Sequence, residues 1–148
     1  NILPTLKSRC LTFKINLTFN ETLNISNSIL EKNVLDFVNF DLLSYYNSPG
    51  DIISLFNFAE EKSINLKDHT ISSFINLLIE NNYYKKNKPV KVLLINLIEL
   101  FFLKEYVITN TKTSLINFYH KFIKKINNTE KFNLDEESLF LEFKSKLL

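Results

Sequence analysis

The stretch VKVLLINLIELFFLKEYVI, residues 90–108, is the most hydrophobic run of the chain and decides its fold class. A membrane-spanning helix needs about 20 predominantly apolar residues. This run is interrupted by Lys91, Asn96, Glu99, Lys104 and Glu105, which favours a helix buried in the protein over one in a bilayer. We therefore expect a central helix over residues 89–109, a mainly α fold and no membrane contact.

Helical periodicity continues on both sides of this run. We predict helices near 20–32 (capped by Asn20), 36–46 (capped by Asp36), 51–62, 69–82 and 112–127, and a last helix from the NLDEE stretch at 133–137 to the chain end. In NSPGD, Ser48 can cap, Pro49 suits the first helical position and Asp51 completes a capping box. The residues expected to face the core are Ile52, Ile53, Phe56 and Ala59; Ile71, Phe74, Ile75, Leu78 and Ile79; Leu115, Ile116, Tyr119, Phe122, Ile123 and Ile126; and Leu139, Phe140, Phe143 and Leu147.

Residues 11–17, LTFKINL, alternate between apolar and polar side chains, which indicates a half-buried β-strand. Nothing further along the chain repeats the pattern, and a strand without partners is not stable. We therefore expect the strand to be the last piece of a preceding domain. The sequence begins at Asn1 and contains no methionine, so we interpret it as a fragment of a longer polypeptide.

Composition argues against several classes of site. The net charge of +2 is too small to indicate nucleic-acid binding by itself, and one glycine cannot build a glycine-rich phosphate loop. One cysteine excludes an internal disulfide and a cysteine-based zinc site, which favours a reducing compartment. His69 and His120 have no partner at ligand spacing, so we predict no metal site.

The densest basic patch is YYKKNKPVK, residues 83–91, in which Lys85, Lys86 and Lys88 are candidate nucleic-acid contacts. Lysines can bind the phosphate backbone, and the neighbouring tyrosines can stack on bases. A solvated turn between helices explains the same residues, and we favour that interpretation. The acidic run at 135–137 is explained by the affinity of carboxylates for a helix N-terminus.

Arg9 is the only arginine among 18 basic residues, and it lies beside the only cysteine, Cys10. A guanidinium has a planar fork of donors that can bind two oxygens of a carboxylate or phosphate at once, which an ammonium cannot do. Chance or a structural ion pair explains a lone arginine equally well from composition alone. For Cys10, which has no activating base in view, we expect a buried structural role.

Residues 2–10, ILPTLKSRC, followed by the alternating segment, resemble the Ser-Arg-Cys motif of clamp-loader subunits in the AAA+ superfamily. A second stretch, LLSYYNSPGDIISL at residues 42–55, resembles the start of a lid-domain helix in the same proteins, with Ser48, Pro49 and Gly50 matching. The two stretches occur in the family's order and precede an all-helical tail. Within the family, the chain is most similar to the delta prime class of the bacterial DNA polymerase III clamp loader.

The resemblance implies three parts: residues 1–17 as the end of an ATPase-like domain, 18–64 as a three-helix lid, and 65–148 as a helical collar that oligomerises. It implies that Arg9 is an arginine finger acting in trans on ATP, which a neighbouring subunit binds with magnesium. Ser8 and Cys10 would hold the turn that aims it. The implied partners are the gamma/tau and delta subunits, the sliding clamp and primer–template DNA, in the bacterial cytoplasm.

Two positions depart from the family pattern. Asn47 replaces its first glycine, and Asp51 stands where many relatives have an arginine that senses nucleotide in their own subunit. The resemblance therefore implies a subunit that assists DNA replication without hydrolysing ATP and without a cofactor of its own. A gamma/tau-type or other AAA+ ATPase, and a helical adaptor or nucleic-acid-binding module, are the alternative interpretations.

Overall fold

The computed structural model describes residues 16–44, 47–85, 87–109, 112–132 and 135–147, and within these ranges the protein is mainly α-helical and has no β-strand. The helices are α2 (Phe19–Leu30), α3 (Val34–Phe37), α4 (Pro49–Lys62), α5 (Ile71–Glu80), α6 (Lys88–Ile108), α7 (Lys112–Phe132) and α8 (Glu137–Leu147). Two 3₁₀ turns, η1 (Phe40–Leu42) and η2 (Leu66–Asp68), lie between them. The predicted mainly α class is confirmed for this part of the chain.

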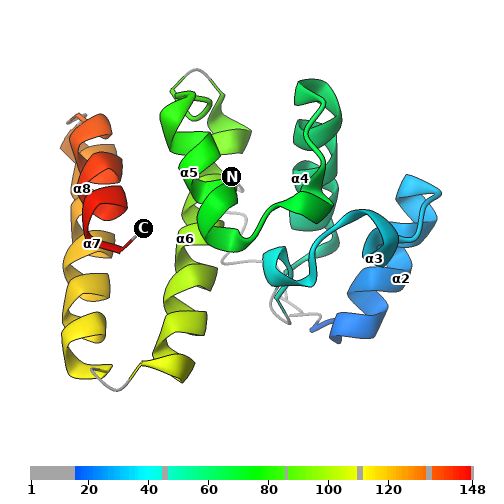
Figure 1. The fold of residues 1–148 in the computed structure, drawn as a ribbon, viewed down its shortest axis with the longest axis horizontal. Coiled ribbons are helices and arrows are strands. Elements are labelled where there is room, and N and C mark those ends of the chain that lie inside the picture. Colours follow the sequence, from blue (N-terminus) through cyan, green and yellow to red (C-terminus); the bar gives the residue numbers. More distant parts are fainter. Residues whose placement is uncertain (1–15, 45–46, 86, 110–111, 133–134, 148) are drawn as a thin grey trace, which may run out of the picture.

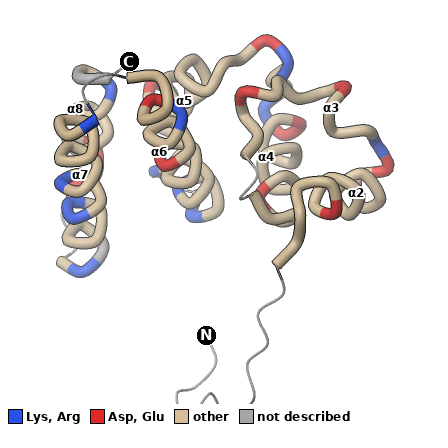
Figure 2. The backbone as a smooth tube through the Cα atoms, turned by 90° about the horizontal axis from the view of Figure 1, so that it is seen from below, with Lys and Arg blue, Asp and Glu red and all other residues tan. Residues whose placement is uncertain are grey.

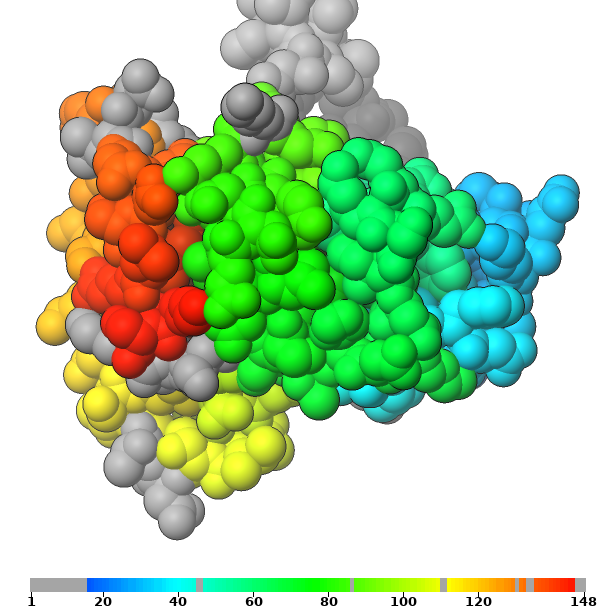
Figure 3. Space-filling view, turned by 45° about the horizontal axis from the view of Figure 1, so that its top comes forward, coloured from blue at the N-terminus to red at the C-terminus, as the bar shows by residue number. Residues whose placement is uncertain are grey.

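The helices form two connected groups (Figure 1). α5 and α8 form one layer over a second layer of α6 and α7, as the perpendicular view also shows (Figure 2). α4 packs against α6 at the edge of these four helices, α2 packs against α4, and the short α3 contacts α2 and η2. On one face the surface runs from α8 across α5 to α4 (Figure 3). α6 therefore joins the two groups.

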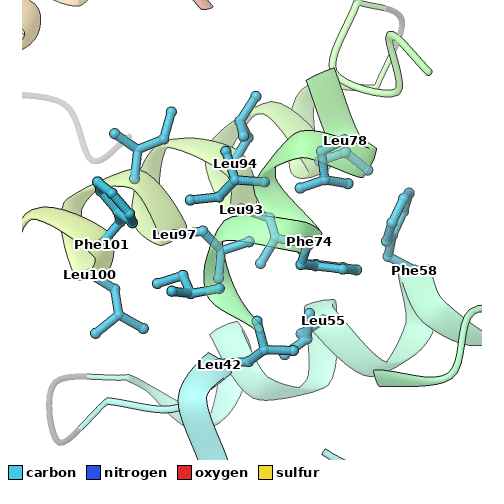
Figure 4. Packing of buried hydrophobic residues seen from close by; sticks show 14 of the residues in the cluster. Leu42, Leu55, Phe58, Phe74, Leu78, Leu93, Leu94, Leu97, Leu100 and Phe101 are labelled. Carbon is cyan, nitrogen blue, oxygen red and sulfur yellow. The ribbon is translucent and has the colours of Figure 1, made fainter. Parts of the chain in front are cut away.

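α6 is the helix that the rest of the structure surrounds. It has buried residues on more than one face, and α4, α5 and α7 each contact it. These buried residues are Val90, Leu93, Leu94, Leu97, Ile98, Leu100, Phe101 and Phe102. Figure 4 shows several of them meeting Phe74 and Leu78 of α5, with Leu42 of η1 and Leu55 of α4 nearby. The central buried helix predicted at 89–109 is confirmed.

The helix predicted over 36–46 is wrong. The chain instead forms α3 and η1, which are joined through Val38, whose backbone is extended (φ −117°, ψ 136°). The Val38 side chain is buried, and the amide of Asn39 donates to the carbonyl of Leu66 at 3.2 Å. The Asn39 side chain then caps η1 by accepting from the amide of Asp41 at 2.9 Å. Contacts with a distant segment thus override the local helical periodicity.

The predicted caps of the first two helices are also wrong. α2 begins after Thr18, whose hydroxyl accepts a hydrogen bond from the amide of Glu21 at 3.3 Å, while the Glu21 carboxylate accepts from the Thr18 amide at 2.8 Å. This reciprocal pair satisfies two amides that the helix itself leaves unpaired. Asn33, and not Asp36, occupies the cap position of α3.

Most residues expected in the core are buried. Those confirmed are Ile52, Phe56, Ala59, Ile71, Phe74, Ile75, Leu78, Ile79, Phe122, Ile126, Leu139, Phe140 and Phe143. Others, such as Ile53, Leu115, Tyr119 and Ile123, are half-buried. The expectation for Ile116 is wrong, since 38% of it is exposed. Ile116 lies in the first turns of α7, and at the end where α7 begins, α6 and α7 extend beyond α5 and α8 (Figure 1).

Phe143 of α8 connects three helices through its ring. It is fully buried, and its ring centroid lies 5.6 Å from that of Phe101 and 5.7 Å from that of Phe102, both in α6. The ring of Phe122 in α7 lies 5.3 Å away. The two contacts with α6 are edge-to-face, which is the geometry that the ring quadrupole favours. This cluster holds α8 against α6 and α7.

We predict that Phe143→Ala lowers the free energy of unfolding by about 3–5 kcal/mol, because it removes a fully buried ring and leaves a cavity. Urea denaturation followed by circular dichroism measures the loss. Leu141→Ala is the matched control: Leu141 lies in the same helix but is 50% exposed, so its loss should stay below about 1 kcal/mol. Equal losses for the two variants would contradict this packing of α8.

Candidate functional site

The residues of the Ser-Arg-Cys motif, Ser8, Arg9 and Cys10, lie outside the described residues, as does most of the strand predicted at 11–17. The described part begins at Asn16, and Asn16 and Leu17 are exposed and have no regular secondary structure. The role given to Arg9 therefore stays a prediction from the sequence.

Ser48, Pro49 and Gly50 lie at the start of α4. The Ser48 hydroxyl accepts a hydrogen bond from the amide of Asp51 at 3.2 Å, and the Asp51 carboxylate accepts from the Ser48 amide at 2.8 Å. Pro49 is the first helical residue, where an amide would have no partner within the helix. The packing does not require a glycine at position 50, since an added Cβ would lie at an ordinary contact distance of 3.6 Å from the Ser48 hydroxyl oxygen. The predicted capping box is confirmed.

Asp51 also ties α4 to the central helix. Its second carboxylate oxygen accepts a hydrogen bond from the side-chain amide of Asn96 in α6 at 3.2 Å. The cavity beside this contact has a volume of only about 10 Å³, which leaves room for one water molecule at most. Asp51 therefore serves to pack α4 on α6, and no ligand-sized space adjoins it.

Asp41, which sequence reasoning missed, connects three elements. From η1, one carboxylate oxygen accepts the amide of Ile71 at the start of α5 at 2.7 Å. The other oxygen pairs with the Lys104 ammonium of α6 at 2.6 Å, and Lys104 also donates to the Asp41 carbonyl. The residues are far apart in sequence, so no local pattern could have indicated this contact.

These contacts hold the pKa of the Asp41 carboxyl below its ordinary value. Burial, the largest single effect, raises that pKa, but the Ile71 amide and the Lys104 ammonium together outweigh it. Asp41 is therefore ionised in the folded protein, and the ionised form is the one that stabilises the fold.

The lysine-rich turn packs against the acidic start of α8. Lys85 pairs with Glu137 at 2.6 Å, and Lys91 pairs with Glu136. Lys88, the first residue of α6, is exposed, whereas Lys86 lies outside the described residues. Lysines and carboxylates are intermingled over these helices (Figure 2). The ion pairs support the interpretation of this patch as an interhelical turn.

An apolar groove lies between the last turns of α6 and the first turns of α7. It has a volume of about 340 Å³; its walls include Phe102, Tyr106, Ile116 and Tyr119, and Glu99 and His120 contribute polar groups. Burial, and to a lesser degree the Glu99 carboxylate, raises the pKa of the Tyr119 hydroxyl. Tyr119 is therefore neutral and can donate a hydrogen bond. Sequence reasoning did not identify this groove, because it expected Tyr119 and Ile116 in the core.

Neither histidine belongs to a metal-binding cluster in the described part of the chain. His69 Nδ1 lies 3.3 Å from the Ser73 hydroxyl, and His120 is exposed on α7. Within the described ranges, no group of three or more His, Cys, Asp or Glu residues is arranged to hold a metal ion. Among the helices described, none is both long enough and apolar enough to cross a membrane.

The chain matches no protein-family model, and it has no significant match among curated proteins or among solved structures. Its function must therefore be inferred from its residues and their geometry. The features available are the two sequence motifs, the polar contacts made by α6 and the groove at its end.

We predict that Asp41→Asn lowers the free energy of unfolding at neutral pH by about 1–2 kcal/mol, because it weakens charge-assisted hydrogen bonds to a helix start and to a lysine. Urea denaturation measures the change. Asp36→Asn is the control, since Asp36 is exposed and its side chain bonds Asn33 in the same short segment. An effect no larger than that of the control would contradict the role of Asp41.

The same carboxylate predicts a pH dependence. Because its pKa is lowered in the folded protein, ionised Asp41 stabilises the fold fully above the ordinary pKa of 3.8. That contribution is lost as the pH falls through the lower, folded pKa. The stability difference between wild type and Asp41→Asn should be constant between about pH 7 and pH 5 and shrink toward about pH 3. A difference that grows on acidification would mean that the pKa is shifted the other way.

Proposed function

We propose that the chain belongs to a clamp-loader subunit of the delta prime class, which helps neighbouring ATPase subunits to load a sliding clamp on primer–template DNA. The observation that carries the proposal is the sequence ILPTLKSRC at residues 2–10, in which Ser8, Arg9 and Cys10 match the family motif. The second motif adds support, since Ser48, Pro49 and Gly50 lie at a capped helix start. The helical character of the described residues is compatible with a lid at 18–64 and a collar at 65–148.

Arg9 would supply what a lysine cannot. ATP hydrolysis spreads negative charge over the oxygens of the transferred phosphoryl group, and a planar guanidinium can bind two of these oxygens at once. The ATP and its magnesium ion would belong to the neighbouring subunit, so this chain would promote hydrolysis only within the assembly. Arginines supplied in this way raise rates by about 10³–10⁵-fold.

Asp51 favours an assisting subunit over an ATPase. In the ATP-binding relatives that the sequence resembles, an arginine at this position senses nucleotide in its own subunit. Here one oxygen of Asp51 accepts from Ser48 and the other accepts from Asn96. Both oxygens are thus used inside the fold. We therefore propose that the subunit does not sense or hydrolyse nucleotide through its lid.

The test uses the full-length protein reconstituted with its ATPase partner subunits, a sliding clamp and primed DNA. We predict that Arg9→Lys lowers DNA-stimulated ATP hydrolysis by about 10³-fold while the mass of the assembly stays unchanged, because lysine keeps the charge but loses the fork. Lys7→Arg, the reverse exchange two residues away, is the matched control and should leave the rate unchanged.

Native mass spectrometry separates the two ways in which the proposal can fail. Unchanged hydrolysis in an intact Arg9→Lys assembly would reduce Arg9 to a structural residue. Failure of the wild-type protein to assemble with the ATPase partners would overturn the clamp-loader proposal altogether.

A further inference from the structure

Glu99 and Glu105 are the two half-buried carboxylates of α6, and of the two only Glu99 lines the groove. Lys91, Asn96 and Lys104 each bind a carboxylate on another element. The half-buried Glu99 makes no ion pair and no hydrogen bond within the described part of the chain. Partial burial of a carboxylate without a cation is unfavourable. A cation supplied from outside would therefore stabilise this side chain.

The groove that holds Glu99 has walls suited to a cation with an apolar stem. Phe102, Tyr106 and Tyr119 contribute aromatic rings, and the face of an aromatic ring attracts ammonium and guanidinium groups. The chain already makes one such contact there: the Lys112 ammonium lies 5.0 Å from the centroid of the Tyr106 ring. Lysine and arginine side chains place their methylene groups on apolar surface while the charged end binds a polar group.

The surface around the groove is apolar and exposed. Leu103 is 51% exposed, and Val107 and Ile108 at the end of α6 are 79% and 75% exposed. Figure 1 shows this end of α6 and α7 extending beyond α5 and α8, and in Figure 3 it (yellow) lies at the lower edge, below the other helices. Contiguous exposed apolar surface of this kind marks interaction sites.

We propose that the groove between α6 and α7 binds an apolar helical segment of a partner protein, which inserts one arginine or lysine beside Glu99. Charge complementarity selects this occupant, because the Glu99 carboxylate lies among the apolar lining residues of the groove and attracts a cation. The volume of about 340 Å³ is at the small end of ligand pockets, which suits one long side chain and its neighbours. The inference does not depend on the clamp-loader proposal.

The test uses the whole chain, labelled with ¹⁵N, and two synthetic helical peptides. One peptide presents Leu, Arg and Leu along one face, and the other has Gln in place of Arg. Chemical shifts are followed as each peptide is added to wild type, to Glu99→Gln and to Glu105→Gln. Glu105 is the matched control, because it lies on the same helix outside the groove. Circular dichroism checks that each variant is folded.

We expect the Arg peptide to bind wild type about tenfold more tightly than the Gln peptide, with shifts at Tyr106, Ile116 and Tyr119. That preference should vanish in Glu99→Gln and persist in Glu105→Gln. Comparing both peptides on wild type and on Glu99→Gln isolates the coupling between Glu99 and the arginine. Ile116→Lys, which changes an exposed residue and places a cation at the groove, should abolish binding of the Arg peptide even if Glu99→Gln does not fold.

Several results would overturn the inference. The first is that the Arg peptide does not bind up to about millimolar concentration, or binds no more tightly than the Gln peptide. The second is that the preference for arginine persists in Glu99→Gln. The third is that Ile116→Lys binds the Arg peptide as tightly as wild type does. Shifts of the groove residues on concentrating the protein alone would instead make a second copy of the chain the occupant. Binding of vesicles that contain anionic lipid through the same residues would identify a membrane surface.

Discussion

The burial of α6 is the constraint on which the other elements depend. Between Val90 and Phe102 the helix has buried residues on several faces, and no single neighbouring helix can cover them all. Because burying apolar surface contributes about 25 cal/mol per Å², α4, α5 and α7 are all held against α6 at the same time. α2 then packs on α4, and α8 packs on α5 and α7. The positions of α2 and α8 therefore depend on the helices that pack directly on α6.

Hydrophobic burial is not directional, so polar contacts determine how the neighbours of α6 are oriented. Lys91 binds the start of α8, Asn96 binds the start of α4, and Lys104 binds η1 through Asp41. Each contact reaches the beginning of an element or a short turn. Those residues interrupt the hydrophobic run in the sequence, and in the structure they orient the elements around it. The side chains of Glu99 and Glu105 make no such contact within the described residues, and Glu99 lines the groove at the end of α6.

The sequence predicted what depends on local periodicity and missed what depends on distant contacts. α4 to α8 were placed to within five residues at each described end, because each has apolar residues at helical spacing. The prediction over 36–46 was wrong because Val38 and Asn39 dock on the core and on the segment around Leu66. The pair of Asp41 and Lys104 spans 63 residues, and a single sequence carries no signal for it. The resemblance of the segment around Arg9 to a clamp-loader motif stays a prediction, because those residues lie outside the described part of the chain.

The packing of α4 on α6 limits how the proposed subunit could move. Residues 18–64 and 65–148 meet through Asp51 and Asn96 and through the rings of Phe58 and Phe74, whose centroids lie 6.3 Å apart. The two segments share one buried core, so a hinge between them would expose apolar surface at a cost that grows with the area exposed. In the proposed assembly, the lid and the collar are therefore expected to turn together as one body, and a response to nucleotide in the neighbouring subunit would change the position of that body rather than its shape.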